Sequence, residues 1–253
     1  MPKLSIITIN FNNLAGLKKT VESVGGPLPL DCEWIVVDGL STDGSVEFID
    51  YAPFTHKIIE KDRGIYDAMN KGLKAANGDF VWFMNSGDRF HSSDSVSRMI
   101  YFIEQFPEID CFYGDTEFVN EQYEPLGLIS KLKPQKFPKN LNKNSFRTGM
   151  SICHQSFVVK KSKCDEYNLQ YKFAADVDWI IRILKKKPST KAVDFVVADF
   201  AVGGSSYQHT QKAMKERYRI LAEHYGWLSN ILAHTWIVIR RILFNLKGRE
   251  QYK

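Results

Sequence analysis

The sequence lacks the cysteine pattern and the charge excess that identify several classes of protein. Its four cysteines have no metal-site spacing and are too scattered for a secreted disulfide framework, so we expect reduced thiols. The net charge of +5 over 253 residues is too small to predict binding to nucleic acid. Much of the excess lies late in the chain, which favours an anionic substrate or an acidic surface as the partner.

Long apolar runs are also missing. The first apolar run, residues 4–9, is too short for the core of a signal peptide and leads directly into polar residues. His234, Arg240 and Arg241 interrupt the apolar run near the end of the chain, which argues against a membrane-spanning helix. We therefore expect a cytoplasmic protein.

The loop after the first apolar run contains no glycine. A dinucleotide-binding dehydrogenase needs G-x-G-x-x-G at this place, and a nucleotidyltransferase usually has a glycine-rich, arginine-containing loop there. The loop in this chain reads NFNN over residues 10–13. It therefore argues against both of these enzyme classes.

Short apolar segments alternate along the chain with segments of helical periodicity. Strands are predicted at residues 4–9, 34–37, 56–60, 80–84, 111–113, 155–159 and 192–202. Helices are predicted at residues 14–24, from a cap at Ser41 through Ile49, at 65–76 and 93–105, from about 174, and over 208–246. This alternation indicates an α/β fold with a mostly parallel central sheet flanked by helices. Residues 115–155 have little periodicity, and we expect them to form loops and short strands of a binding surface.

Two aspartates follow strands of this predicted sheet. Ligands bind at the carboxyl ends of the strands in such sheets, so we expect Asp38 and Asp88 to line one crevice. The turn of Ser86, Gly87 and Asp88 suits Mg²⁺ or Mn²⁺, because these ions accept few protein carboxylates when phosphates and water supply the other ligands. The alternative is a turn aspartate that binds no metal.

Three charged residues surround the start of the helix predicted at 65–76. Asp62 and Arg63 lie in the turn before it, and Asp67 lies in its first turn. We interpret all three as ligand contacts. The alternative is a turn followed by a solvated helix face.

Asp176 and Asp178 begin another predicted helix. With 3.6 residues per turn, their side chains point about 200° apart, so only one of them can face a given crevice. The other explanation of a carboxylate at this place is a helix cap or a partner of the helix dipole.

Five segments together resemble an inverting glycosyltransferase of family 2 with the GT-A fold. They read, in order, SIITINFNN, VVDGLSTDGS, EKDRGIYDAMNKGLKAANGDFVWFMNSGD, HQSFVVKK and FAADVDWIIRI. The similarity is greatest to the branch of colanic-acid and other exopolysaccharide sugar transferases, and it covers roughly residues 3–205. It implies a GT-A domain over residues 1–205 and a C-terminal helical extension over residues 206–253.

The resemblance also implies an activity. A metal-dependent hexosyl- or N-acetylhexosaminyltransferase of this kind moves a sugar from a nucleotide-diphosphate sugar to a hydroxyl of a glycan or lipid-linked acceptor. The setting would be the synthesis of a bacterial surface polysaccharide. The alternatives are a nucleotidyltransferase and a non-catalytic sugar-nucleotide-binding protein. Ser86 favours the latter, whereas Asp88 and Asp176 disfavour it.

Roles for single residues follow from the same resemblance. Around the nucleotide sugar it places Thr8, Asn10, Asn12, Asp38, Asp62, Arg63, Asp67, Ser86 and Gly87. Asp88 becomes the main protein ligand of Mn²⁺ or Mg²⁺, because Ser86 replaces the first aspartate of the family's Asp-X-Asp motif. Asp176 becomes the catalytic base. His154 matches a position near the acceptor or the metal, and Asp178 is a further candidate there.

The tail, residues 227–246, carries leucines and isoleucines at helical spacing together with tryptophan and arginine. An amphipathic helix of this kind can lie on an anionic membrane, here the inner face of the cell membrane, which suits an enzyme that extends a lipid-linked sugar. The alternative is a helix packed on its own domain or on a second subunit of a homodimer. Both interpretations stay open at the level of sequence.

Overall fold

The computed structural model describes residues 2–150, 152–202 and 210–250. The strands are β1 (Leu4–Asn10), β2 (Cys32–Asp38), β3 (His56–Ile59), β4 (Phe80–Phe83), β5 (Arg89–Phe90), β6 (Cys111–Val119), β7 (Pro125–Leu128), β8 (Phe157–Lys160) and β9 (Thr190–Ala201). The helices are α1 (Leu14–Glu22), α2 (Ser45–Tyr51), α3 (Ile65–Ala75), α4 (Ser95–Gln105), α5 (Ile129–Leu132), α6 (Ala175–Lys185), α8 (Thr210–Tyr225) and α9 (Trp227–Glu250).

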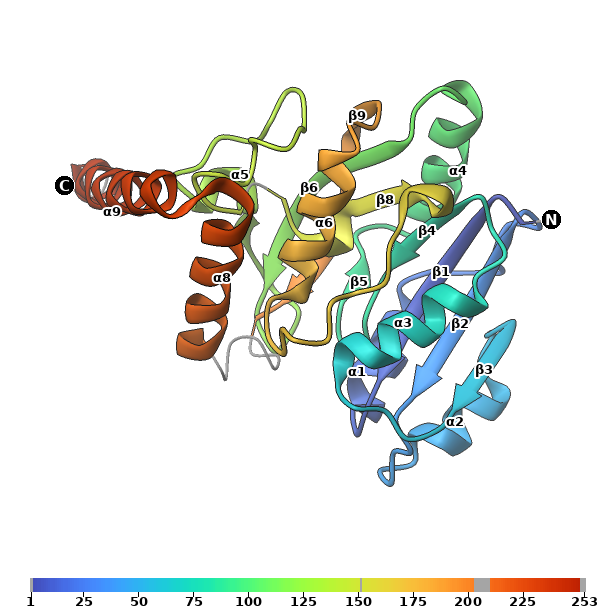
Figure 1. The fold of residues 1–253 in the computed structure, drawn as a ribbon. Coiled ribbons are helices and arrows are strands. Elements are labelled where there is room, and N and C mark those ends of the chain that lie inside the picture. The colour runs from blue at the N-terminus through green and yellow to red at the C-terminus, as the bar shows by residue number, and fades with distance from the viewer. Residues whose placement is uncertain (1, 151, 203–209, 251–253) are drawn as a thin grey trace.

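All the strands join one sheet of order β3-β2-β1-β4-β8-β6-β9-β5, with β7 paired to β6 (Figure 1). The first four strands in this order run parallel, as expected for strands linked by crossover helices. β8 runs antiparallel to both β4 and β6, because the chain reaches it through the long irregular segment before residue 157. The predicted α/β fold is confirmed, and the second half of its sheet is mixed.

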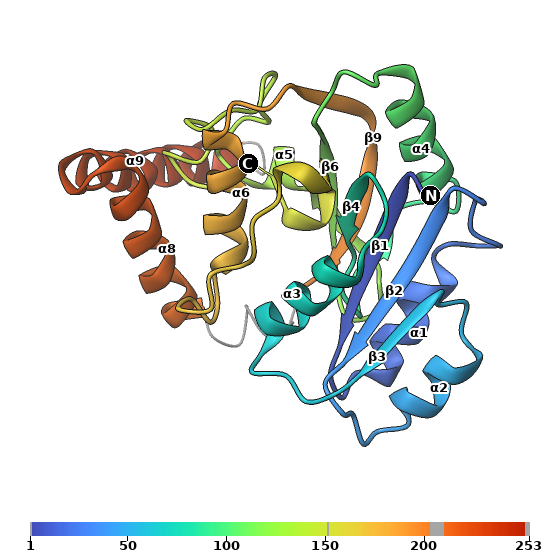
Figure 2. The same cartoon turned by 45° about the vertical axis from the view of Figure 1, so that its right-hand side comes forward.

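Helices cover both faces of the sheet (Figure 2). Side chains alternate along the buried strands, so that Ile7 and Ile9 of β1 face one core cluster while Leu4 and Ile6 face the other. Helices α3, α6 and α8 pack over the first cluster, and α1, α2 and α4 pack over the second. Burial on both faces explains why these strands read as continuous apolar runs.

Three details differ from the sequence prediction. Ser41 does not cap a helix, because α2 begins at Ser45 after Gly44, whose φ of 92° ends the preceding turn. The strand expected at 111–113 continues to residue 119, where it pairs with β9. The tail is not one helix, because Gly226, with φ of 87°, separates α8 from α9.

The two C-terminal helices differ in how they meet the rest of the protein. Ile220 and Leu221 of α8 belong to the core cluster beneath α6. α9 extends away from the body (Figure 1), held near its start by a 2.9 Å hydrogen bond from Arg147 Nε to Ser229 Oγ. Within the described residues, no helix is long and apolar enough to cross a membrane. The predicted domain boundary at residue 205 lies outside the described residues.

Trp179 of α6 tests the packing that holds α6 on the sheet. Its side chain is 1% exposed, and its ring stacks on Tyr167 with centroids 4.8 Å apart. We expect Trp179→Ala to lower the free energy of unfolding by about 3–5 kcal/mol, because it leaves a cavity in the core. Trp227→Ala is the matched control, since Trp227 is 60% exposed. Urea unfolding followed by circular dichroism should separate the two, and equal losses would contradict the packing.

Candidate functional site

The carboxyl ends of β1 and β2 meet through a pair of polar side chains. The register places Asn10 opposite Asp38, and Asn10 Nδ2 donates to Asp38 Oδ2 at 2.7 Å. The backbone N–H and the hydroxyl of Ser41 also donate to the Asp38 carboxylate, each at 2.7 Å. Asp38 is fully buried, whereas Asn10 Oδ1 is a buried acceptor without a partner among the described residues. Asp38 therefore shapes this strand end, and Asn10 keeps an acceptor free for a ligand.

The loop after β1 is fastened to the loop after β2. Asn12 adopts a φ of 47°, its N–H donates to Ser41 Oγ at 2.8 Å, and its Oδ1 accepts from Thr42 N at 2.8 Å. This leaves the Phe11 ring 61% exposed at the strand ends. Asn12 thus positions the loop, and Phe11 offers an aromatic face beside it that the sequence prediction did not single out.

Asp62 lies against the same strand ends. A Cβ added to Gly39 would come within 2.5 Å of Asp62 Oδ2 and 3.0 Å of the Phe11 ring, so only glycine permits this approach. Asp62 Oδ1 accepts from Gly64 N at 2.9 Å, which leaves Oδ2 at the edge of the crevice. Its position beside the nucleotide stays a prediction.

Arg63 and Asp67 bind each other. Arg63 Nη2 lies 3.0 Å from Asp67 Oδ1, and the Arg63 N–H donates to Asp67 Oδ2 at 3.0 Å. The pair lowers the pKa of Asp67 and fastens the start of α3. The Arg63 side chain is 78% exposed, so it is accessible to a ligand. Asp67 holds the guanidinium of Arg63 in position.

Thr8 does not reach the crevice, and its predicted contact with the nucleotide is corrected. Its side chain is fully buried. Its hydroxyl donates to the Met84 carbonyl at 2.8 Å and accepts from Trp34 Nε1 at 2.9 Å. Thr8 therefore ties β1 to its two neighbouring strands.

The turn after β4 is held in place by the end of β1 and the loop that follows it. Asn13 Nδ2 donates to the Ser86 carbonyl at 3.1 Å, and the Ser86 N–H donates to Ile9 O at 3.1 Å. Gly87 has a φ of 99°, a conformation that an L side chain rarely adopts. The turn thereby presents Asp88 inward instead of toward solvent.

Asp88 is a buried carboxylate with little compensation for its charge. Oδ2 accepts from Gln155 Nε2 at 2.8 Å, and Oδ1 accepts from Ala201 N at 3.3 Å. Burial raises the pKa of Asp88 to about 7, although the two hydrogen bonds lower it. Across the described chain, no lysine, arginine or histidine forms an ion pair with it. Either a proton or a bound cation can compensate a buried carboxylate of this kind.

The residues around Asp88 fit a divalent cation that takes few protein ligands. Asn85 Oδ1 and His154 Nε2 are buried and have no partner among the described residues. No group of three His, Cys, Asp or Glu side chains with metal-site geometry occurs in the described ranges. One carboxylate with amide and substrate oxygens is the ligand set that Mg²⁺ and Mn²⁺ accept beside a diphosphate.

A cavity of about 270 Å³ lies next to this turn. It is lined by Ile65, Tyr66, Met69, Asn85, Phe118, Lys133, Met150, Cys153, His154, Gln155, Asp176, Phe200, Thr210, Ala213 and Arg217. Gln155 therefore borders the cavity, and its side-chain amide binds Asp88, which is not part of the lining. This single residue connects the predicted metal ligand to the predicted base.

Asp176 lies in the first turn of α6 and faces the cavity. Tyr66 of α3 donates its hydroxyl to Asp176 Oδ1 at 3.0 Å. Burial raises the pKa of Tyr66 well above its ordinary value, so the hydroxyl keeps its proton and remains a donor. Burial likewise lowers the pKa of His154, which is neutral at pH 7. The cavity thus holds a fixed carboxylate beside an uncharged imidazole.

Asp178 points away from the cavity. This agrees with the helical spacing, which allows only one of Asp176 and Asp178 to face it. His224 Nε2 lies 2.7 Å from its Oδ1, and Arg182 Nε donates to its Oδ2 at 2.8 Å. Burial alone would raise the pKa of Asp178, but these two partners outweigh it and lower the pKa. Its predicted place near the acceptor is therefore corrected: Asp178 joins α6 to α8.

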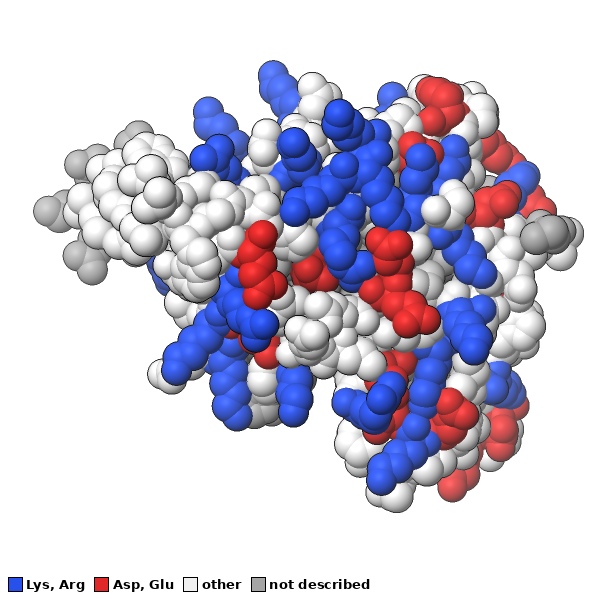
Figure 3. Space-filling view, in the orientation of Figure 1, with Lys and Arg blue, Asp and Glu red and all other residues white. Residues whose placement is uncertain are grey.

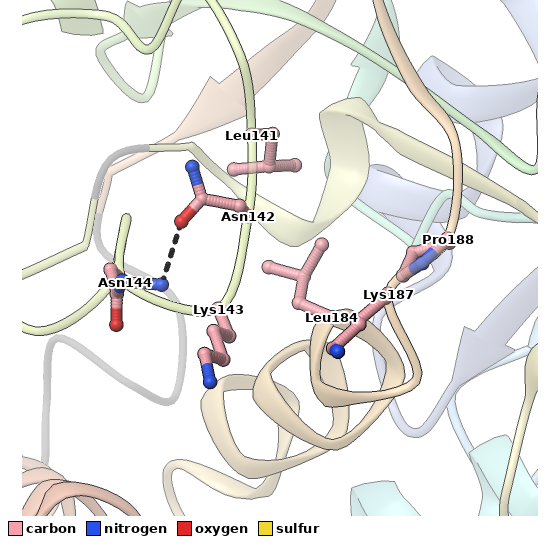
Figure 4. A pocket seen from close by; sticks show the side chains of 7 residues that line it. All are labelled: Leu141, Asn142, Lys143, Asn144, Leu184, Lys187 and Pro188. Atoms are coloured by element: carbon pink, nitrogen blue, oxygen red, sulfur yellow. Dashed lines mark hydrogen bonds between the residues drawn. The ribbon is translucent and has the colours of Figure 1, made fainter.

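A second cavity, of about 230 Å³, lies between the segment 141–144 and the end of α6 (Figure 4). Its lining is Leu141, Asn142, Lys143, Asn144, Leu184, Lys187 and Pro188. Asn142 Oδ1 accepts from the backbone N–H of Asn144 at 2.9 Å. No carboxylate, histidine or thiol lines this cavity in the described residues, and we assign no chemistry to it.

Besides Phe11 and Asn85, four residues of the site were not predicted as such: Tyr66, Gln155, Lys133 and Arg217. Tyr66 and Gln155 stand inside segments that carry the family resemblance, so their order in those segments was a usable signal. Lys133 and Arg217 come from segments that carry no motif, and only the folded chain brings them to the cavity.

The raised pKa of Asp88 predicts a pH-dependent stability. An aspartate in an unfolded chain has a pKa of about 3.9. The folded-state pKa is higher, at about 7. The contribution of Asp88 to the free energy of unfolding is therefore fully present below pH 4 and is lost as the pH rises through 7. In EDTA, we expect Asp88→Asn to raise the melting temperature at pH 8 and to leave it unchanged at pH 4. Parallel melting-temperature curves for the two proteins would contradict this electrostatic assignment.

Comparison with known proteins agrees with the geometry. The family model described as glycosyl transferase family 2 matches residues 5–167. The chain is 30% identical to the uncharacterized glycosyltransferase Rv1514c of Mycobacterium tuberculosis over 262 residues, 99% of this chain and 92% of the relative. It is 29% identical to a PGL/p-HBAD biosynthesis glycosyltransferase of Mycobacterium bovis over 226 residues, 85% of this chain and 84% of the relative.

Solved structures share the fold. The S. aureus TarS 1–349 structure in complex with UDP-GlcNAc aligns with a TM-score of 0.65 and 16% identity, covering 88% of this chain and 66% of that one. The mannosyltransferase PcManGT from Pyrobaculum calidifontis, in complex with GDP-Man and Mn²⁺, aligns with a TM-score of 0.56 and 18% identity, covering 94% and 74%. The polar strand ends and the buried carboxylates lie at one edge of a sheet with the GT-A fold. Together with the family match, they show that the chain belongs to glycosyl transferase family 2 and is an inverting glycosyltransferase.

Proposed function

We propose that this glycosyltransferase is metal-dependent and moves a hexosyl or N-acetylhexosaminyl group to a lipid-linked acceptor in the synthesis of a bacterial surface glycan. The observation that carries the proposal is the position of Gln155, which binds Asp88 on one side and borders the cavity of Asp176 on the other. A donor held at the strand ends would then meet an acceptor held beside Asp176.

Names of relatives support the acceptor class. The M. bovis relative is named for PGL/p-HBAD biosynthesis, and a Bacillus subtilis relative, 31% identical over 122 residues, is named a putative teichuronic acid biosynthesis glycosyltransferase. TarS and PcManGT were solved with UDP-GlcNAc and with GDP-Man and Mn²⁺. The metal, the sugar and the acceptor of this chain are proposals that rest on its own site.

The proposed reaction is a single in-line displacement at the anomeric carbon. Asp176 accepts the proton of the incoming hydroxyl, while the Tyr66 hydroxyl holds Oδ1 and fixes the carboxylate. Asn10, Asp62 and Arg63 line the edge where the nucleotide would lie. A bound Mn²⁺ or Mg²⁺ would supply Lewis-acid charge for the leaving diphosphate, and Asp88 would hold it with Asn85 as a neutral oxygen donor.

Asp176→Asn tests the base. The amide cannot accept the proton but keeps the shape of the side chain, so we expect transfer to fall by about 10²–10⁴-fold while donor binding stays within about threefold. A thermal-shift panel of sugar nucleotides with Mn²⁺ would choose the donor, and release of the nucleoside diphosphate would report turnover. Asp178→Asn is the matched control: it should lower the melting temperature and keep turnover within a few-fold. Full turnover by Asp176→Asn would remove Asp176 as the base.

We also propose that α9 docks on an anionic membrane. It exposes many large apolar side chains: Trp227, Leu228, Ile231, Leu232, Trp236, Val238, Ile239, Ile242, Leu243, Phe244 and Leu246. On the face drawn in Figure 3 the surface of α9 is largely uncharged, and an exposed apolar area of this extent marks an interaction site.

Charge on the neighbouring segment favours a membrane over a second subunit as the partner. No aspartate or glutamate occurs between Glu124 and the start of β8, a stretch with six lysines and arginines. Arg147 of this stretch binds Ser229 of α9, and Arg240 Nη2 donates to the Thr148 carbonyl at 2.8 Å. An apolar helix beside a basic, acid-free segment suits anionic lipid headgroups.

Flotation with vesicles tests this docking. The full chain should float with vesicles containing about one third phosphatidylglycerol and should float much less with phosphatidylcholine alone or at 0.5 M salt. A triple substitution, Leu232→Gln, Ile239→Gln and Leu243→Gln, should abolish flotation and leave the melting temperature unchanged, because all three side chains are exposed. If flotation persists in that variant, or a dimer that the substitutions dissociate is found by light scattering without flotation, the membrane assignment is wrong.

A further inference from the structure

The cavity beside Asp176 contains two cationic side chains that the transfer chemistry does not use. Lys133 follows α5, Arg217 belongs to α8, and both line the cavity together with Asp176 of α6. The other titratable groups that line it are uncharged at pH 7: burial raises the pKa of Cys153 to about 11 and lowers that of His154. The lining therefore carries a net positive charge.

Neither cation has an anionic partner in the part of the chain that the structure describes. Lys133 Nζ lies 5.4 Å from the centroid of the Phe118 ring, and no carboxylate pairs with it. Arg217 Nε is buried and makes no hydrogen bond there. Arg219, one half-turn further along α8, shows the contrast, because its Nε lies 2.7 Å from Glu223 Oε1.

The charge of one cation affects the pKa of the other. Burial lowers the pKa of Lys133, and the charge of Arg217 lowers it further. Burial raises the pKa of Tyr66 and the charge of Arg217 works against this, and both residues line the same cavity as Asp176. Among the described residues, Asp176 is the one carboxylate that lines the cavity, so two cationic side chains share it with a single anionic one, and a further anion would balance the charge.

We propose that Lys133 and Arg217 form a subsite for a phosphate or diphosphate group beside Asp176. A guanidinium offers a planar fork of donors and an ammonium offers a point charge, and together they suit the several oxygens of a phosphate. The subsite rests on the proposed function and deepens it, because an acceptor whose lipid is joined to the sugar through phosphate presents that group next to the sugar. The donor's own diphosphate is the second source of the same group.

Inorganic pyrophosphate is the probe, measured by isothermal titration calorimetry on the full chain in EDTA. The wild type should bind it, and Arg217→Gln and Lys133→Gln should each weaken binding at least tenfold. Matched controls are Lys215→Gln on α8 and Lys131→Gln on α5. Both are exposed lysines, two residues from Arg217 and Lys133 respectively, and both variants should bind as the wild type does. Glucuronate, a singly charged sugar acid, should bind weakly to all of them.

A second arm identifies the source of the phosphate. If pyrophosphate still binds in the presence of saturating UDP and Mn²⁺, the subsite holds the acceptor's phosphate; if UDP and Mn²⁺ displace it, the subsite holds the donor's diphosphate. Asp88→Ala should keep pyrophosphate binding in EDTA, which separates the subsite from the proposed metal site. The proposal is overturned if the wild type does not bind pyrophosphate, or if Arg217→Gln and Lys133→Gln bind it like the controls.

Discussion

The position of β1 between β2 and β4 is the constraint on which the site depends. Parallel pairing brings the carboxyl ends of these strands to one edge, and the register sets Asn10 opposite Asp38. The loop that leaves β1 then reaches both neighbours, through Asn12 to the loop after β2 and through Asn13 to the turn after β4. The nucleotide edge and the Asp88 turn are therefore parts of one hydrogen-bonded unit.

Buried charges divide into two groups with different consequences. Asp178 and Asp199 each have basic partners, namely His224 and Arg182 for the first and Arg89 and His91 for the second, so they stabilise the packing of elements. Asp88, Lys133 and Arg217 have no partner of opposite charge among the described residues, and all lie in or directly behind the cavity of Asp176. Charged groups that folding leaves uncompensated are candidates for ligand contacts.

The sequence predicts well what depends on local pattern. Asp38 and Asp88 follow apolar strands, and helical periodicity alone showed that Asp176 and Asp178 could not face the same crevice. Side-chain contacts depend on the fold, which is why Thr8 was assigned to the nucleotide although its hydroxyl joins three strands. The break at Gly226 was missed because a single glycine is tolerated within a helical pattern.

Lys133 and Arg217 mark the limit of such prediction. One follows a short helix in an irregular, lysine-rich segment, and the other lies on a helix with several exposed basic residues. Nothing in their local sequence distinguishes them from solvated lysines and arginines. The packing of α8 against α6, through side chains such as Ile220, brings Arg217 to the cavity of Asp176, and the packing of α5 on β6 brings Lys133 there.

The central claim is that the buried carboxylate of Asp88 binds the metal that accompanies the nucleotide. Anomalous diffraction near the manganese edge, from crystals grown with UDP and Mn²⁺, tests it most directly. The account predicts an anomalous peak about 2.0–2.3 Å from an oxygen of Asp88, with the Gln155 amide displaced from that carboxylate. UDP bound at the strand ends with no manganese at Asp88, and with the hydrogen bond from Gln155 intact, would contradict it.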